Sequence, residues 1–313
     1  MKFEHLQGLI AAPFTPMDNN GGINTTIIPA YYKFLKQNGN TGAFICGSTG
    51  EGVSLTIEEK KHITDVWAKC TVSDKDFKVM LLVGGNTLAD CIELAKHAQK
   101  AGIYAVSFTS PSYFKPANVA VLAQMCRQIA AAVPGIPFYY YHIPVLTNVG
   151  FPMIDLLNAV NDVPNFAGIK YTHEDFMDFL SCSTFQNGQY DMLWGRDENM
   201  LPALAVGAKG AVGSTFNYAA PLYYDLINAF ENNDLEKAQQ LQQKSVDMIR
   251  LLGKYGGISV GKAYMKLVGI DCGEFRLPVS NMTQEQFENF KLDVSKLGFD
   301  EFKSNLQPQV SIK

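Results

Sequence analysis

A strand, a helix and a second strand are predicted by residues 79–109, which read VMLLVGGNTLADCIELAKHAQKAGIYAVSFT. The first and last five residues are mostly apolar or β-branched, as expected of strands buried on both faces of a parallel sheet. Between them, Ile92, Leu94 and Ala95 are spaced for burial on one side of a helix, and Gly102 is placed to end that helix. The stretch therefore predicts one β–α–β unit of a parallel sheet.

The same alternation extends on both sides of this unit. Strands are expected at residues 8–14, 42–46, 79–83, 105–109, 137–141, 166–171, 191–195 and 210–215. Helices are expected at residues 56–70, 87–101 and 118–132, and after Pro221 at residues 222–231, 235–254, 259–268 and 283–297. Eight strands that each precede a helix favour an α/β fold of the (β/α)8 TIM-barrel type with a C-terminal helical extension. A doubly wound open sheet is the alternative, because periodicity does not reveal whether a sheet closes.

The domain organisation follows from where the strand pattern stops. Residues 1–220 are expected to form the (β/α)8 barrel, and residues 221–313 the last barrel helix and the helical extension of the same domain. At 313 residues the chain is long enough to bury a large core without disulfides or structural metals.

Composition excludes several classes of protein. Hydrophobic residues make up 47% and charged residues 18% of the chain, which is typical of a globular protein and excludes a disordered or fibrous one. A net charge of -4 without any lysine- or arginine-rich run argues against nucleic acid as a partner. A mean hydropathy of -0.02 without a long apolar stretch argues against a membrane span.

The cysteines and the first ten residues indicate the cellular compartment of the protein. The six cysteines never form a Cys-x-x-Cys pair, which fits reduced, buried thiols and argues against a disulfide framework or a zinc site. The first ten residues include an acidic residue and lack the apolar core of a signal peptide. We therefore expect a cytoplasmic protein.

Candidate catalytic residues follow the strands, because active sites of barrels lie at the carboxyl ends of the strands. Gly47-Ser48-Thr49-Gly50-Glu51-Gly52 supplies flexible backbone and two hydroxyls for an anion, or is an ordinary glycine-rich turn. Lys170 ends the sixth run, where desolvation would yield the neutral amine of a Schiff-base enzyme; alternatively it extends to the rim. Tyr141 ends the fifth run, where its phenol could move a proton or simply fill the barrel.

Two further strand ends carry polar residues. The seventh run ends in Gly195-Arg196-Asp197-Glu198, whose carboxylates suit hydrogen bonds to a polyhydroxylated ligand or the start of the next helix. The eighth run ends in Gly213-Ser214-Thr215, whose small residues leave room for a ligand or for close packing. Each signal is weak alone, but all of them fall at strand ends.

Taken together, these motifs resemble the dihydrodipicolinate synthase / N-acetylneuraminate lyase family of class I aldolases. The resemblance runs from about residue 6 to residue 268 and rests on four segments in the right order. They are Gly47-Ser48-Thr49-Gly50-Glu51, Tyr141-His142-Ile143-Pro144, Gly168-Ile169-Lys170 and Gly213-Ser214-Thr215.

The resemblance implies roles for individual residues. Lys170 would form an imine with the C2 ketone of pyruvate or of a pyruvyl-ended substrate, and Tyr141 would exchange the proton at the bond that breaks. Ser48 and Thr49 would bind the pyruvyl carboxylate. Tyr113 matches a family tyrosine that supports the catalytic tyrosine, often across a subunit interface.

The same resemblance bears on the substrate. Leu146 stands near the place where dihydrodipicolinate synthases carry an arginine for the second substrate, whereas sialic acid lyases carry the Gly-x-Asp-Glu pattern of residues 195–198. The residues expected to bind the sugar portion are Thr172, Gly195, Asp197, Glu198 and Ser214. His142 departs from the asparagine of many bacterial lyases, which puts in doubt only the packing behind the catalytic tyrosine.

The resemblance thus implies reversible cleavage of N-acetylneuraminate, a sialic acid, to pyruvate and N-acetylmannosamine. The alternatives are dihydrodipicolinate synthesis, another pyruvate-dependent aldolase reaction, or a non-catalytic relative that binds ligands. No cofactor and no metal are expected, because the imine replaces the Lewis acid of metal-dependent aldolases. Family members are usually homotetramers, and the expected partner is otherwise only the small-molecule substrate.

Overall fold

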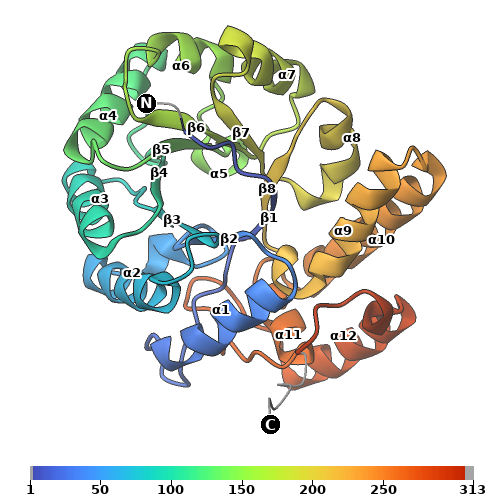
Figure 1. Cartoon of the computed structure of the whole chain (residues 1–313). Helices are drawn as coiled ribbons and strands as arrows, with labels where there is room; N and C mark the ends of the chain where they lie inside the picture. The colour runs from blue at the N-terminus through green and yellow to red at the C-terminus, as the bar shows by residue number, and fades with distance from the viewer. Residues whose placement is uncertain (1–2, 307–313) are drawn as a thin grey trace.

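In the computed structural model, which describes residues 3–306, parallel strands form a ring enclosed by helices (Figure 1). Within that range eight strands pair in chain order. They are β1 (Gly8–Ala11), β2 (Gly42–Ile45), β3 (Lys78–Leu82), β4 (Ala105–Thr109), β5 (Phe138–His142), β6 (Phe166–Tyr171), β7 (Asp191–Trp194) and β8 (Gly210–Gly213). The sheet closes because β1 also pairs in parallel with β8, from Gly8 opposite Gly210 to Ala11 opposite Gly213. The predicted closed barrel is confirmed, and the open sheet is excluded.

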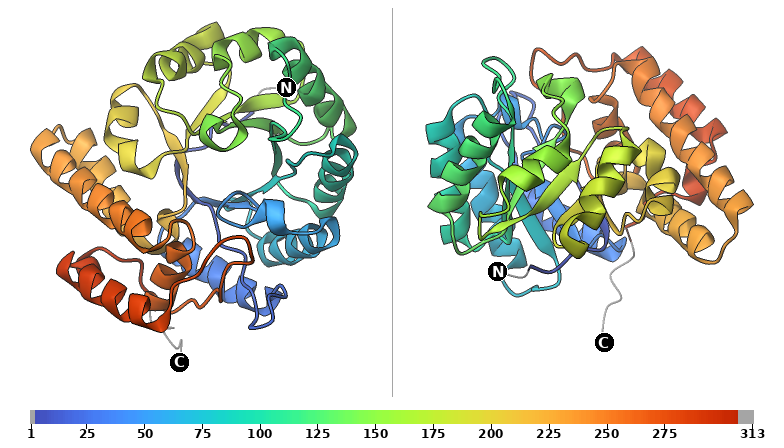
Figure 2. Two further views of the ribbon diagram at one scale, coloured as in Figure 1. Left: turned by 180° about the vertical axis from the view of Figure 1, so that it is seen from behind. Right: turned by 90° about the horizontal axis from the view of Figure 1, so that it is seen from above.

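Helices cover the outer face of the barrel and continue at one side of it (Figures 1 and 2). Those between the strands and after β8 are α1 (Ile28–Gln37), α2 (Ile57–Thr71), α3 (Leu88–Ala101), α4 (Val119–Ala132), α5 (Pro144–Thr147), α6 (Met153–Ala159), α7 (Phe176–Thr184), α8 (Met200–Ala205) and α9 (Phe216–Glu231). The C-terminal extension contains α10 (Leu235–Tyr255), α11 (Val260–Leu267) and α12 (Gln284–Lys296). None of the helices in residues 3–306 has the length and apolar character needed to span a bilayer.

Local capping explains why the three helices predicted between strands form where they do. Thr56 and Glu59 form a reciprocal capping box at the start of α2. Asn118 caps α4 by accepting a hydrogen bond from the Val121 N–H. Gly102 ends α3 in the left-handed conformation, which glycine adopts without a steric penalty.

The last barrel helix begins earlier than predicted. The sequence places its start at residue 222, after Pro221, but α9 begins at Phe216 and contains the proline. A proline inside a helix lacks an N–H donor and crowds the turn before it, so the sequence rule predicts a break there. The helix instead bends at Ala219, where φ is −141° and ψ is 31°. The expected boundary between residues 220 and 221 therefore falls inside α9.

Apolar side chains pack in two layers because alternate residues of each strand face opposite sides of the sheet. The barrel interior contains Phe44, Tyr139, Tyr141 and Leu193 among other buried residues. A larger cluster fills the space between the sheet and the helices. Both layers consist of buried apolar side chains, so a charged group placed among them is costly unless it is paired.

The pairing of β5 with β6 shifts by one residue near its start. Phe138 lies opposite Phe166, but Tyr139 lies opposite Gly168, so Ala167 is an extra residue on β6. Beyond the shift, Tyr141 lies opposite Lys170. Without the extra residue Tyr141 would face Ile169, whose side chain belongs to the layer outside the barrel.

Gly168 also permits close approach of β6 to β7. A Cβ atom at this position would lie 1.8 Å from the backbone oxygen of Asp191. We expect Gly168→Ala to lower the free energy of unfolding by about 2 kcal/mol or more, because the strands would have to separate. Thermal unfolding followed by circular dichroism would measure the loss as a fall in Tm.

Gly85→Ala is the matched control, because no atom of residues 3–306 other than those of its chain neighbours lies within 4 Å of a Cβ at Gly85. Its Tm is expected to stay at or slightly above that of the wild type, since alanine restricts the unfolded chain more than glycine does. Equal Tm values for the two variants would contradict the packing argument for Gly168.

Candidate active site

Lys170 and Tyr141 lie side by side at the carboxyl end of the barrel. The Lys170 Nζ is 4.0 Å from the centre of the Tyr141 ring and 3.9 Å from the centre of the Phe44 ring. The two rings meet edge to face with their centres 5.5 Å apart. Lys170 is only 4% exposed, so its amine is enclosed largely by aromatic carbon.

This environment favours the neutral amine. Burial lowers the pKa of Lys170 from 10.5 to about 7, and the Asp197 carboxylate opposes the change. Across residues 3–306 no hydrogen bond or ion pair engages the Lys170 Nζ, apart from its contacts with the two ring faces. At neutral pH a large fraction of the amine therefore carries the free electron pair that a nucleophile requires.

The neighbouring phenol is held in its protonated form. Burial raises the pKa of Tyr141 to about 12, the hydroxyls of Ser48 and Thr172 act in the opposite direction, and the Asp197 charge adds to the rise. Tyr141 is thus equipped to donate a proton at neutral pH. To accept one, it would need a nearby cation or a hydrogen-bond donor to stabilise the phenolate.

The turn after β2 presents Ser48 and Thr49 at the same end of the barrel. The Glu51 N–H donates to the Ser48 carbonyl across 3.2 Å, which closes the turn. Gly52 must be a glycine, because a Cβ there would lie 1.9 Å from the Cys46 oxygen. Ser48 is half-buried and Thr49 is buried. The Ser48 hydroxyl hydrogen-bonds the Tyr141 side chain and lowers the pKa of its phenol. The turn therefore places a hydroxyl directly beside Tyr141.

Asp197 follows β7, and its carboxylate is fixed by Thr215 just after the end of β8. Its Oδ2 accepts hydrogen bonds from the Thr215 N–H at 2.9 Å and the Thr215 hydroxyl at 2.6 Å. Gly213 allows this approach, since a Cβ there would lie 2.2 Å from Asp197 Oδ1. Burial raises the pKa of Asp197 to about 6, while the Thr215 hydrogen bonds act to lower it. The sequence placed these two strand ends in the site, and the structure brings them into contact.

Thr172 and Gly195 are also brought together. The backbone N–H of Gly195 donates to Tyr171 O at 2.8 Å, and a Cβ on Gly195 would lie 1.9 Å from the Thr172 hydroxyl oxygen. That hydroxyl is buried and lies close enough to the Tyr141 phenol to lower its pKa. Ser214 is half-buried at the end of β8.

Glu198 is already engaged in an ion pair. Arg196 Nη2 lies 2.7 Å from Glu198 Oε1 and 2.8 Å from Glu174 Oε1. Arg196 thereby links the loops after β6 and β7. Glu198 can still accept further hydrogen bonds, because a carboxylate has about four acceptor positions.

Tyr113 does not reach the site within one chain. It is 78% exposed on the loop after β4, and its ring packs edge to face on Phe114, which is 85% exposed. The Tyr113 N–H donates to the Asn86 side chain at 3.4 Å. Within one subunit, Tyr113 therefore makes no contact with Tyr141 in this structure.

A cavity of about 420 Å³ opens beside Ser48 at the mouth of the barrel. Its wall includes Thr109, Ile143, Leu146 and Ile258, and the described residues that line it carry no charge. Ile258 lies in the C-terminal extension, between α10 and α11, so the extension contributes to this wall.

Three residues that shape the site were missed by the sequence analysis. Phe44 was counted only as part of a strand, Thr215 only as part of a small-residue motif, and Arg196 only as the variable residue of its segment. Strand alternation places Phe44 and Ile45 on opposite faces of the sheet, but it does not say which of them faces the barrel interior. Nothing in the sequence indicates that Thr215 contacts Asp197. Residues 3–306 contain no group of three His, Cys, Asp or Glu side chains placed to bind a metal.

A buried lysine and a tyrosine at the mouth of a (β/α)8 barrel are the arrangement of a class I aldolase, a carbon–carbon lyase. The model of the dihydrodipicolinate synthetase family matches residues 5–297, and the chain belongs to this family.

Several relatives in the family share most of the chain. N-acetylneuraminate lyase of Rattus norvegicus is 40% identical over 302 residues, which are 95% of this chain and 94% of that protein. The structure of N-acetylneuraminate lyase from Proteus mirabilis superposes with a TM-score of 0.91 at 38% identity, covering 95% of this chain and 100% of that one. The enzyme from Aliivibrio salmonicida gives a TM-score of 0.91 at 36% identity, covering 95% and 98%.

The low pKa of Lys170 can be measured directly. Trace labelling with acetic anhydride, mapped by mass spectrometry over a pH series, should show the reactivity of Lys170 rising with pH around a midpoint of about 7. The direction follows because only the neutral amine reacts. Asp197→Asn should move the midpoint to lower pH, since the carboxylate stabilises the protonated amine. A midpoint near 10, the usual value for a solvated lysine, would contradict the desolvation argument.

Proposed function

We propose that the protein reversibly cleaves N-acetylneuraminate to pyruvate and N-acetylmannosamine through an imine on Lys170. The observation that carries the proposal is the buried amine of Lys170, with a pKa near 7, between the rings of Phe44 and Tyr141. The names of the relatives at 36–40% identity over about nine-tenths or more of the chain support the choice of substrate.

The bonding changes follow from these two side chains. The Lys170 amine adds to the C2 ketone of the open-chain sugar acid and water leaves, which forms a protonated imine. Tyr141, as phenolate, removes the proton of the C4 hydroxyl, the C3–C4 bond breaks, and its electron pair is accepted by the imine. N-acetylmannosamine leaves with its new aldehyde. Protonation of C3 and hydrolysis of the imine then release pyruvate and restore the amine.

The protonated imine also prepares Tyr141 for its role. The pKa of Tyr141 is raised by burial in the free protein, which disfavours the phenolate. A cation on Lys170, about 4 Å from the phenol ring, favours the phenolate and so lowers that pKa. The imine thus keeps a cation beside the phenol at the step that needs the base.

Binding roles are assigned to the remaining strand ends. Ser48 and Thr49 would hold the pyruvyl carboxylate through hydroxyl and backbone N–H groups. The residues that would bind the hydroxyls of the sugar portion are Thr172, Gly195, Asp197, Glu198 and Ser214. Leu146 carries no charge, so an acidic amino aldehyde would lack a counter-charge at this position.

The proposal extends to assembly and compartment. Tyr113 and Phe114 are large exposed side chains, a pattern typical of a surface that packs against another subunit. In a homotetramer Tyr113 would support Tyr141 of a neighbouring subunit. All six cysteines are free, which fits the reducing cytoplasm.

Turnover should depend on Lys170 and Tyr141 in different ways. Lys170→Met should abolish pyruvate release from N-acetylneuraminate, and borohydride should no longer trap pyruvate on the protein. Tyr141→Phe should lower kcat by about 10²- to 10⁴-fold, as expected for loss of a proton-transfer group, while pyruvate is still trapped on Lys170. Release can be followed with a lactate dehydrogenase assay. Substantial activity of the folded Lys170→Met variant would refute the imine mechanism.

Recognition of the sugar should depend on Asp197. No hydrogen bond from residues 3–306 reaches Asp197 Oδ1, so this oxygen is open to a sugar hydroxyl. Asp197→Asn should raise KM for N-acetylneuraminate by about tenfold, the effect of weakening a hydrogen bond to a charged group. Glu174→Gln, which alters the ion pair of Arg196 beside the site, is the control and should change KM little. An unchanged KM in Asp197→Asn would remove this residue from the sugar site.

A further inference from the structure

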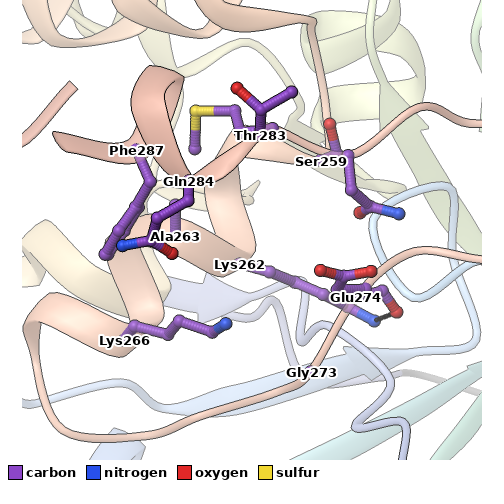
Figure 3. A pocket seen from close by; sticks show the side chains of 11 residues that line it. Ser259, Lys262, Ala263, Lys266, Gly273, Glu274, Thr283, Gln284 and Phe287 are labelled. Atoms are coloured by element: carbon purple, nitrogen blue, oxygen red, sulfur yellow. Dashed lines mark hydrogen bonds between the residues drawn. The ribbon is translucent and has the colours of Figure 1, made fainter. Parts of the chain in front are cut away.

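A buried ion pair joins the turn after β2 to the C-terminal extension. Lys262 Nζ on α11 lies 2.7 Å from Glu51 Oε1, and the two side chains are 2% and 1% exposed. Lys262 Nζ also donates to the Glu274 backbone oxygen at 2.9 Å. Figure 3 shows the Lys262 side chain extending from α11 toward the segment that carries Gly273 and Glu274. The pair thus connects residues 211 positions apart in the chain.

The second oxygen of Glu51 is held by the same segment. Glu51 Oε2 accepts a hydrogen bond from the Arg276 N–H at 2.8 Å. The Arg276 side chain in turn donates to Gly21 O at 2.7 Å, Ser54 O at 3.0 Å and Glu59 Oε2 at 2.9 Å. Both carboxylate oxygens of Glu51 are therefore fixed by residues of the C-terminal extension.

The backbone of Glu51 adopts a conformation that needs such support. Its φ is 57° and its ψ is 27°, in the left-handed region. For a residue with a side chain this costs about 1–2 kcal/mol, and it persists where the surroundings dictate it. The same backbone closes the turn on Ser48, and the Gly52 N–H donates to Gly47 O at 3.0 Å. The orientation of Ser48 and Thr49 is thus tied to the conformation of Glu51.

Stability alone does not account for an ion pair at this place. The cost of removing two charges from water offsets much of their attraction, so an apolar pair of similar size is often as stable. The charged pair instead fixes the direction of the Glu51 side chain. Each of the two oxygens of the Glu51 carboxylate accepts a hydrogen bond from one donor of the extension, Lys262 Nζ or the Arg276 N–H.

We infer that Glu51 and Lys262 are positioning residues, through which the C-terminal extension holds Ser48 and Thr49 in the geometry that binds the carboxylate of a 2-oxo acid. This inference rests on the proposed carboxylate-binding role of Ser48 and Thr49. Breaking the pair weakens the affinity for pyruvate while leaving the chemistry at Lys170 in place, because Lys170 belongs to β6 and is held by the barrel.

Glu51→Gln, compared with Glu59→Gln, tests the inference. Both variants exchange one glutamate for glutamine in an ion pair to the extension, but Glu59 pairs with the Arg276 side chain and does not touch the turn at Ser48. Glutamine at position 59 also preserves the capping box of α2. The measurements are the pyruvate concentration for half-maximal cyanoborohydride trapping on Lys170, the trapping rate at saturation, and Tm.

We expect Glu51→Gln to raise the half-saturating pyruvate concentration about tenfold or more, with the saturated trapping rate within about threefold of wild type. Glu59→Gln should leave the half-saturating concentration within about twofold, even where Tm falls. A purely structural role of Glu51 would lower Tm and the amount of reactive protein without changing the concentration dependence, and that result would overturn the inference.

Ser48→Ala separates this inference from the proposed function. Weaker pyruvate binding in Ser48→Ala with unchanged binding in Glu51→Gln would overturn the inference and leave the proposed function standing. A wild-type protein that never traps pyruvate would overturn both.

The double variant Glu51→Gln/Lys262→Met covers the case in which the single variant fails to fold. Removal of both charges avoids an unpaired buried ammonium, so Tm should recover toward wild type. The half-saturating pyruvate concentration should remain raised, because the directional anchor is still missing. Recovery of wild-type affinity in the double variant would overturn the inference.

Discussion

Closure of the sheet is the constraint on which the site depends. The pairing of β1 with β8 makes a ring in which all strands run the same way, so the residues that follow every strand meet at one end. Lys170, Tyr141, Asp197 and Ser48 come from different strands and share no sequence neighbourhood, yet they converge there. An open sheet would spread the same residues along an edge. The proximity of these side chains is therefore a consequence of the closed topology.

Desolvation sets the chemical state of the convergent groups. Burial lowers the pKa of Lys170 and raises the pKa values of Tyr141 and Asp197. A neutral amine, a protonated phenol and a readily protonated carboxyl therefore lie close together. Asp197 moderates the effect because its charge favours the protonated amine and disfavours the phenolate. Formation of an imine would introduce a fixed cation into this cluster, and the phenol and the carboxylate would both respond to it.

The C-terminal extension contacts the mouth of the barrel at two places. It supplies Ile258 to the wall of the cavity and Lys262 to the turn that carries Ser48. The sequence indicated helices here but gave no reason to connect them with the strand ends, since Glu51 and Lys262 are separated by most of the chain. A buried ion pair is a tertiary feature, and its two members look like ordinary charged residues when each is taken alone.

The sequence by itself determined the class of fold, the order of strands and helices, and the strand ends that carry reactive groups. Apolar runs and caps are local signals, and the resemblance to known aldolases added the roles of those groups. Only the tertiary structure decided closure, the bend that lets α9 begin before Pro221, and the contact of Thr215 with Asp197. It also decided that Tyr141 faces Lys170, because the extra residue Ala167 shifts the register of β6 by one. Strand register depends on pairing between distant segments, and a shift of one residue turns a side chain from the interior of a barrel to its outside.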